Sequence, residues 1–488
     1  MSTAAIPVAQ TPPDKEARQD LRHWMKRVLR ERSKARRDLD EDAIHDLRVA
    51  LRRCRAVAEG LEQVDPDPSW KRMRKMAKRL LDSLSELRDI QVLQTTAAKV
   101  KIHRGRSRKL LREIWSTRED EAEKRVAEAL DNFDVKQWKR WRRELPDRAA
   151  RIPRDSPAVE LLALEAWKNG WERHRFSQRS RSKLSLHKTR IGIKRFRYSV
   201  EDFLPSRYEK WSGELKELQD LLGDVHDLDV LWGEIARLRK KISNREREEW
   251  HAAIERKREP LLEKYHQLAS GDHSRWSEWR ASLPAGGELE RTRVVFLAKW
   301  AAYLDPEPAR ARRLARLALQ IFDGLRAAGL IGSDFHDSRG ALEVAALVHG
   351  VGRTASGHID PKETYKLIRH AVPPPGWSQD RMEVIARIAR HYADGTSGAG
   401  GNWSRVSSRQ SAEILLLAGI LRLADALMKT DRKVARVRVG MENNAAIVRA
   451  AGFDSTGESA ASVAAARSLL ETELNRPVLV LPLGKSAA

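Results

Sequence analysis

Apolar residues recur at helical spacing along most of the chain. Between positions 47 and 61 they fall three or four residues apart, at Leu47, Leu51, Cys54, Ala58 and Leu61. A second set with the same spacing runs from Thr189 to Phe203. This spacing places one apolar stripe along each helix, as in a helix packed in a bundle. We therefore predict helical regions over 14–144 and 159–279.

Prolines divide these regions. Pro205 and Pro260 are predicted to break the second helical region, because proline lacks a backbone donor and disfavours a helical predecessor. A cluster at Pro146, Pro153 and Pro157 is expected to mark the connection between the two regions. The pattern thus predicts two helical halves, 14–145 and 158–282.

A basic pattern accompanies the apolar one and also occurs twice. The segments 44–55 and 186–197 both place cations at +3, +7, +8 and +10 from a histidine. The two histidines, His45 and His187, are 142 residues apart (187 − 45). Positions 0, +3, +7 and +10 of a helix fall within an arc of about 80°, so each helix carries a basic stripe apart from its apolar one.

The duplication extends further along the chain. Segment 87–93 contains Arg88-Asp89 and corresponds to segment 225–231, which contains His226-Asp227, at an offset of 138. Each half is therefore expected to be a bundle of about four helices. Two such bundles can face each other across a pseudo-twofold axis, and the two basic stripes would then line a shared groove or pore.

A row of cations can also be an ordinary solvated face, which is where most Lys and Arg side chains lie. Repetition at fixed positions argues against that interpretation, since a solvated face needs no fixed positions. The net charge of +24 and the eight cations without an acid between 179 and 197 indicate a polyanionic partner. Nucleic acid, an anionic membrane surface and a phosphate polymer all have this chemistry.

Other features narrow the class of protein. The single cysteine, Cys54, excludes a disulfide framework and fits a reducing compartment. We find no signal peptide and no apolar run near the ~20 residues that cross a bilayer, and expect a cytoplasmic protein without membrane association. Residues 1–13 are expected to be disordered. No phosphate-binding loop, serine elbow or paired-cysteine motif is present, and no cofactor is expected.

The two histidine motifs, together with Arg88-Asp89 and His226-Asp227, resemble the CHAD family, the conserved histidine α-helical domain, over about residues 14–280. The resemblance implies two four-helix bundles with a basic central cavity that binds inorganic polyphosphate and is not known to catalyse. It implies these phosphate ligands: His45, Arg48, Arg52, Arg53, Arg55, Arg74, Lys78, Arg88, His187, Arg190, Lys194, Arg195, Arg197 and His226. His226 stands where an arginine is more usual, so its charge would depend on pH.

Beyond an expected linker at 283–294, further helices and a short α/β tail are predicted. The segments 314–323, 345–353 and 420–427 resemble the HD-type C-terminal domain of the exopolyphosphatase and guanosine pentaphosphate phosphohydrolase family, over 295–488. An active HD centre needs a His-Asp doublet, but this chain has His349-Gly350, and Arg310 where a histidine is frequent. Remaining metal candidates are His349, His358, His370, His391 and Asp425. Scattered histidines on helices are more often structural, so no metal is expected.

The sequence thus predicts a mainly α protein with two domains, 14–282 and 295–488. The function that we favour is non-catalytic binding of polyphosphate, and the protein could be located at polyphosphate granules. A homodimer is possible. One alternative is a phosphohydrolase acting on polyphosphate or guanosine polyphosphates through the HD-like domain. The other is nucleic-acid binding, with stacking on Trp138, Trp141, Trp167 and Trp171, although tryptophans at helical spacing are more often core.

Overall fold

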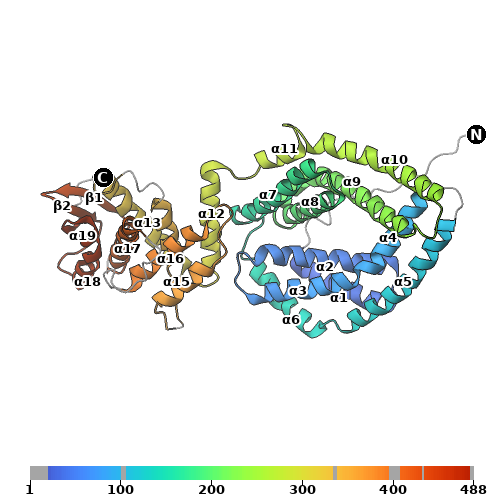
Figure 1. Ribbon diagram of the computed structural model, residues 1–488. Coiled ribbons are helices and arrows are strands. Elements are labelled where there is room, and N and C mark those ends of the chain that lie inside the picture. Colours follow the sequence, from blue (N-terminus) through green and yellow to red (C-terminus); the bar gives the residue numbers. More distant parts are fainter. Residues whose placement is uncertain are drawn as a thin grey trace, which may run out of the picture. The chain divides into compact units, whose positions relative to one another are not determined.

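The computed structural model describes residues 20–100, 106–332, 338–354, 356–394, 407–430 and 434–483. The chain is mainly α-helical with one small sheet near its C-terminus, which confirms the predicted fold class (Figure 1). It forms two compact units, Met1–Leu289 (unit 1) and Glu290–Ala488 (unit 2). The predicted disorder of residues 1–13 lies outside the described residues. No helix in the described segments is long and apolar enough to span a membrane.

The first half of unit 1 is built from α1 (Leu21–Ala35), α2 (Glu41–Leu61), α3 (Pro68–Ser83), α4 (Ser85–Lys99), α5 (Arg106–Asp131) and α6 (Val135–Ala149). Helices α1, α2, α3 and α6 pack around one core, and α4 pairs with α5. Side-chain caps fix the helix starts. Asp40 accepts the backbone N–H of Ala43 at 2.7 Å and begins α2, the helix of the first basic stripe.

The second half repeats this plan with α7 (Pro157–Ser180), α8 (Lys183–Phe203), α9 (Pro205–Arg237), α10 (Asn244–Ala269) and α11 (Arg275–Ala281). Helix α8 corresponds to α2 at both ends with the offset of 142, and α10 corresponds to α5 with the offset of 138. The single helix α9 takes the place of α3 and α4 together. Each half therefore contains a four-helix group, α1, α2, α3 and α6 or α7, α8, α9 and α11, and a further helix pair, α4 with α5 or the C-terminal part of α9 with α10.

Two of the proline predictions need correction. Pro205 begins α9 at its first turn, as predicted, but Pro260 lies inside α10 on an exposed side, where water can serve the carbonyl that loses its partner. Pro146 lies inside α6 and not in the connection. The last turn of α6 is held by Arg148, whose Nε donates to the buried carboxylate of Asp65 at 2.7 Å. The connection is therefore the shorter segment 150–156.

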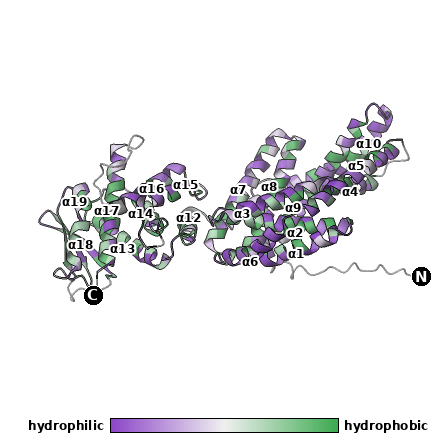
Figure 2. Ribbon diagram, turned by 90° about the horizontal axis from the view of Figure 1, so that it is seen from below, coloured by the Kyte–Doolittle hydropathy of each residue, from purple (hydrophilic) through white to green (hydrophobic). Residues whose placement is uncertain are grey.

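The two apolar stripes form the cores of their bundles. All ten positions predicted from the 47–61 and 189–203 patterns are buried. Trp138, Trp141 and Trp167 are also buried, and Trp171 stacks on Trp167 with ring centroids 5.9 Å apart. Three of the four tryptophans are therefore core residues, and the half-buried Trp171 already stacks on one of them. Figure 2 shows hydrophilic and hydrophobic residues alternating along the helices of unit 1, as amphipathic packing requires.

Unit 2 contains most of α12 (Gly286–Ala301), then α13 (Pro308–Ala327), α14 (Ser338–Val348), α15 (Pro361–His370), α16 (Gln379–Asp394) and α17 (Ser408–Met428). The predicted linker 283–294 contains the boundary between the units, but its residues from Gly286 onwards belong to α12. The correction follows from composition, because the helix-forming run Glu288-Leu289-Glu290-Arg291 comes directly after the two glycines.

The predicted α/β tail follows α17. It consists of β1 (Val437–Glu442), β2 (Ala445–Ala450), α18 (Ser459–Ala466), α19 (Ser468–Leu474) and β3 (Val478–Pro482). β1 and β2 are antiparallel, with Val439 opposite Val448, and are joined at Asn443 and Asn444, which both have positive φ. β3 pairs with β2 in parallel after the two short helices, so the strand order is β1-β2-β3.

Candidate functional site

Helices α2 and α8 pack against each other and bring the two basic stripes together. We call the residues concerned the central cluster: His45, Arg48, Arg52 and Arg88 from the first half, and His187, Arg190, Lys194 and His226 from the second. Their charges act on one another across the halves. The pKa of Lys194 is lowered to about 7 by burial and by the positive charges of Arg190 and Arg52.

The two arginines at +3, Arg48 and Arg190, lie deepest in the central cluster. Arg48 is 8% exposed and donates to the carbonyl of Leu81 at 3.3 Å and the hydroxyl of Ser85 at 3.2 Å. Burial and the charge of Arg52 lower the pKa of Arg48 to about 10. The Nε of Arg190 is buried and has no hydrogen-bond partner among the described residues. An anion placed here would satisfy that donor and relieve the repulsion between the cations.

Two carboxylates, Asp89 of α4 and Asp227 of α9, lie among these cations. Burial raises the pKa of Asp89, and the charges of Arg48 and Arg190 oppose that rise. Asp227 has a raised pKa for the same reason, again opposed by Arg190. Each carboxylate therefore interacts with cations of the central cluster. Arg88 pairs with a third acid, Glu41. Asp89 and Asp227 do not balance the other four Arg and Lys side chains of the central cluster, so the space keeps a positive charge.

The histidines of the second half form a pair. The Nδ1 atoms of His187 and His226 are 3.2 Å apart and the ring centroids 4.3 Å apart. Burial lowers the pKa of His226 to about 4, with smaller effects from Arg190 and His187. Burial and the charge of Arg88 also lower the pKa of His45. Burial also lowers the pKa of His187, so without an anion the protein favours the neutral form of all three imidazoles.

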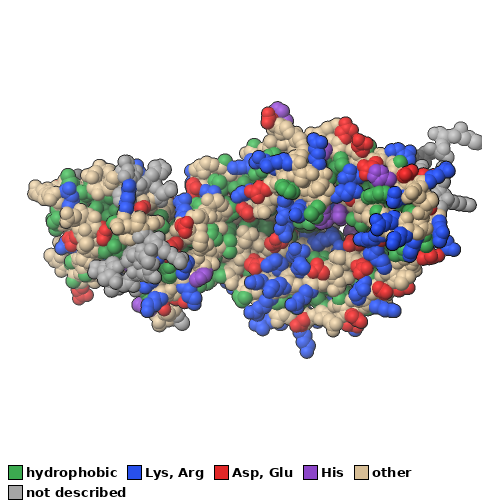
Figure 3. Space-filling model, in the orientation of Figure 1, with side chains coloured by type: hydrophobic (Ala, Val, Ile, Leu, Met, Phe, Trp, Pro, Cys, Tyr) green, Lys and Arg blue, Asp and Glu red, His purple; other side chains and the backbone are tan. Residues whose placement is uncertain are grey.

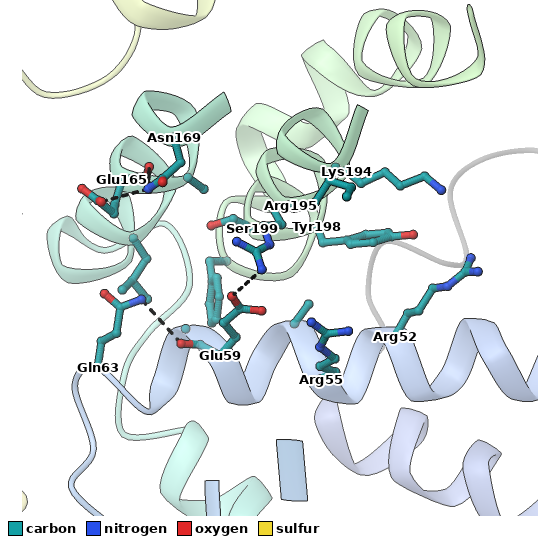
Figure 4. Close-up of a pocket in the computed structure, with 16 residues that line it drawn as sticks. Arg52, Arg55, Glu59, Gln63, Glu165, Asn169, Lys194, Arg195, Tyr198 and Ser199 are labelled. Atoms are coloured by element: carbon teal, nitrogen blue, oxygen red, sulfur yellow. Dashed lines mark hydrogen bonds and ion pairs between the residues drawn. The ribbon is translucent and has the colours of Figure 1, made fainter. Parts of the chain in front are cut away.

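The central cluster opens into two cavities of about 450 Å³ each. Arg52 and Arg55 of α2 and Lys194 and Arg195 of α8 line the first one, and Figure 4 shows Arg52 and Lys194 extending toward the same side. The second cavity is lined by residues that include Arg88 and Asp227. Figure 3 shows Lys and Arg side chains inside and around a hollow on this face of unit 1, with histidine nearby.

The cations at +8 form ion pairs between the two halves. Arg53 is buried, pairs with Glu201, lies 3.6 Å from Asp202 and packs over the rings of Trp24 and Tyr198. Its equivalent, Arg195, pairs with Glu59 at 3.7 Å, and Glu59 is the equivalent of Glu201 at the offset of 142. The two halves thus exchange equivalent ion pairs, as an isologous interface does. The ion pair with Glu201 favours a structural role for Arg53, and its assignment as a phosphate ligand stays a prediction.

Three other predicted ligands lie apart from the central cluster. Arg197 donates to the hydroxyl of Tyr208 at 3.4 Å and approaches Glu201 at 3.8 Å. On α3, Arg74 pairs with Glu62 at 2.7 Å and Lys78 with Asp82 at 2.6 Å. None of the three lines either cavity. Each is held by a carboxylate or hydroxyl on its own side of the bundle.

The structure adds cations that the motifs did not indicate. Lys99 at the end of α4 and Lys257 of α10 line the second cavity. The charge of Arg118, on α5, acts on Asp89. No local sequence signal indicates these cations, because the helices that carry them contain many charged residues and only the tertiary packing shows which of these face the cavity.

The HD-like centre of unit 2 departs from an active one at two positions, Arg310 and Gly350, and keeps His349 and Asp425. The Nδ1 of His349 lies 2.8 Å from the carbonyl of Ala346, and its buried Nε2 has no hydrogen-bond partner among the described residues. Arg310 pairs with Asp425, whose second oxygen is 2.8 Å from Lys429. A Cβ at Gly350 would lie 2.2 Å from Oδ2 of Asp305. The carboxylate of Asp305 therefore occupies the space that an aspartate at position 350 would need.

The other metal candidates are dispersed. His358 and His370 are exposed, and His391 is buried on α16. In the described part of the chain, no three His, Cys, Asp or Glu side chains lie close enough together to hold a metal ion.

Comparison with known proteins agrees with both resemblances. The family model described as CHAD domain matches residues 17–236, and the one described as Ppx/GppA phosphatase, domain III, matches residues 299–476. None of the curated proteins compared with the chain matches it. The solved structures that match include the crystal structure of the CHAD domain from the plant Ricinus communis, at 22% identity and a TM-score of 0.36, over 55% of this chain and 90% of that one.

Proposed function

The chain carries a CHAD domain followed by a Ppx/GppA phosphatase domain III, which links it to polyphosphate-related function, and we propose that it binds inorganic polyphosphate through the central cluster without hydrolysing it. One observation carries the proposal. Cations from both halves surround one space and lower one another's pKa values there. Such repulsion destabilises the empty protein, and an anion would remove it.

The side chains of the central cluster suit a chain of phosphate groups. Guanidinium groups bind non-bridging phosphate oxygens through two parallel hydrogen bonds, and an ammonium group adds a compact charge. The unpartnered Nε of Arg190 supplies a buried donor. Residues of the central cluster line two cavities, Arg52 and Lys194 the first and Arg88 the second, which leaves room for several phosphate groups.

The arrangement in unit 2 favours binding over hydrolysis. Arg310 pairs with Asp425, and Asp305 fills the space beside Gly350. A guanidinium next to the remaining carboxylate repels a divalent cation and satisfies the oxygens that would ligate it. The competing function is hydrolysis of polyphosphate through this domain. It would be established if the purified protein released phosphate from polyphosphate with Mg²⁺ or Mn²⁺ and if His349→Ala abolished that release.

The binding proposal is tested by a pair of charge-matched variants. Arg52→Gln/Lys194→Gln removes two equivalent cations that line the first cavity, and Arg239→Gln/Lys240→Gln removes two exposed cations after α9. Loss of charge-assisted hydrogen bonds should weaken binding of long-chain polyphosphate by roughly tenfold or more in the first variant. The second should stay within about threefold, as expected for peripheral charges. Calorimetric titration measures both, and equal losses would contradict the proposal.

Competition separates polyphosphate from nucleic acid as the partner. Duplex DNA at the same phosphate concentration should not displace bound polyphosphate, because three of the tryptophans that could have stacked on bases are core residues and the fourth, Trp171, stacks on Trp167. Displacement by DNA at equal phosphate would favour the nucleic-acid function. Location at polyphosphate granules follows from the proposal and is tested by fluorescence microscopy of the tagged wild-type and Arg52→Gln/Lys194→Gln proteins.

A further inference from the structure

Unit 2 contains a basic groove of about 350 Å³ that shares only Arg310 with the HD-like centre. Three arginines of α13, Arg310, Arg313 and Arg316, line one side of it. Met428 at the end of α17 and Val434, which precedes β1, line the other. The groove therefore lies where α13, α17 and the start of the sheet meet (Figure 1).

The three arginines form a row along one side of α13. At 100° and 1.5 Å per residue, positions 310, 313 and 316 fall within an arc of about 120° and span about 9 Å along the helix axis. Helix α13 is held in place on this side by Gln320, whose Oε1 accepts the backbone N–H of Val437 at 2.8 Å. The row is thus carried by a helix that is anchored to the sheet.

The charge of the groove is not balanced within the described residues. No Asp or Glu lines it. Arg310 shares Asp425 with Lys429, so that single carboxylate already has two cationic partners. Arg313 and Arg316 are exposed, and no ion pair to either is found in the described segments. Arginines concentrated along a concave surface in this way favour a multiply charged anion.

The apolar floor of the groove, formed by Leu317 and Met428 among others, distinguishes it from an open patch. Charges set against a low-dielectric wall interact more strongly with a ligand than charges that are fully surrounded by water. Guanidinium groups about one helical turn apart can bind successive phosphate groups, each through two hydrogen bonds.

We propose that the α13 groove is a second phosphate-binding site, which takes a short run of linked phosphate groups. The site is separate from the central cluster and lies in the other unit, so it goes beyond the binding proposed for the CHAD domain. Its ligand chemistry is an oligophosphate, which either a polyphosphate chain or the phosphate tail of a nucleotide can supply.

The test uses the full-length protein with the central cluster weakened by Arg52→Gln/Lys194→Gln. In this background, inorganic tripolyphosphate and ATP are each titrated by calorimetry. Adding Arg313→Gln/Arg316→Gln should weaken tripolyphosphate binding by about tenfold or more, because two charge-assisted contacts are lost. The control is Arg312→Gln/Arg326→Gln, which removes the same charge from exposed positions of the same helix outside the groove and should change affinity less than about threefold.

The results of these titrations distinguish a phosphate site in the α13 groove from unspecific binding to surface charges. Equal losses in the two sets of variants, or no tripolyphosphate binding left in the background protein, would overturn the proposal. Tighter binding of ATP than of tripolyphosphate would identify a nucleotide tail as the source, and the reverse would identify inorganic phosphate. If Arg52→Gln/Lys194→Gln alone left polyphosphate affinity unchanged, the function proposed for the central cluster would fail while the α13 groove could still pass its own test.

Discussion

Lys194 and Arg52 occupy equivalent positions in the two halves but differ in their chemistry. Arginine keeps its charge in a cavity, whereas a buried lysine can lose its proton. The charges around Lys194 come from Arg190 on its own helix, Arg52 and Arg48 on α2, and Asp227 on α9. With burial, the three cations outweigh Asp227 and lower the pKa of Lys194 to about 7. The empty cavity therefore holds a partly deprotonated amine near neutral pH.

We predict that polyphosphate binding takes up protons. A bound anion favours the charged amine and raises the pKa of Lys194 from about 7, so protons are taken up above that pH and affinity increases as pH falls from about 8.5 to 6.5. His226, with a pKa of about 4, adds to this uptake in the more acidic range.

Calorimetry in two buffers of different ionisation enthalpy measures the protons taken up at about pH 8. The matched variant is Lys194→Arg, which keeps the charge and removes the titration. It should bind polyphosphate at least as tightly as the wild type while taking up fewer protons. Proton release, or equal uptake by both proteins, would contradict this account of Lys194.

At the scale of secondary-structure elements, α2 and α8 are joined by two equivalent ion pairs in different environments. Arg53 and Glu201 are both buried, and Asp202 beside them has a pKa raised to about 7, chiefly by burial. The side chains of Arg195 and Glu59 are 45% and 38% exposed. Buried charges become costly when a partner is removed, whereas exposed pairs contribute little.

We predict that Arg53→Ala lowers the free energy of unfolding by about 3 kcal/mol, because Asp202 loses the cation 3.6 Å away and the buried Glu201 keeps only the more distant Arg197. Arg195→Ala removes the equivalent residue of the other half and should cost less than about 1 kcal/mol. Denaturant unfolding of the two variants measures the difference. If both variants lost the same free energy of unfolding, the two ion pairs would be equally solvated. The inference that the buried Arg53 pair stabilises the contact between the halves would then be wrong.

The positions of the helices in unit 1 could be predicted from the sequence. The exact ends of these helices, and the roles of their charged residues, were predicted less well. The apolar stripe that begins at Leu47 identified a buried face because burial imposes the helical period directly. Pro146 and Pro260 were wrongly placed at breaks, since a proline can remain in a helix when its site is near the end or exposed to water. The spacing of cations could not separate Arg52 from Arg53, because neighbouring positions on a helix differ only in what packs against them.

At the scale of the whole molecule, the duplication pointed to the residues of the central cluster but not to Lys99 and Lys257, which line the second cavity. His45 and His187, 142 residues apart, mark two helices that do meet. Asp305 was not predicted, because nothing in the sequence near Gly350 indicates that a carboxylate from the residues before α13 fills that space. Such contacts depend on how distant segments fold together, and a single sequence does not encode them as a local pattern.

The arrangement of the central cluster makes salt dependence the most general prediction for the intact protein. Each phosphate group neutralised by a cation releases counterions, so the logarithm of affinity should fall linearly with the logarithm of salt concentration. With six or more cations engaged, affinity should decrease by roughly a thousandfold between about 50 and 200 mM salt. Arg52→Gln/Lys194→Gln should lower the slope by about two, and Arg239→Gln/Lys240→Gln should leave it nearly unchanged.

Fluorescence titrations of labelled polyphosphate at several salt concentrations give all three slopes. If the slope followed only the net charge of the protein, the two variants would change it equally, and binding would be attributed to the surface as a whole and not to the space between α2 and α8.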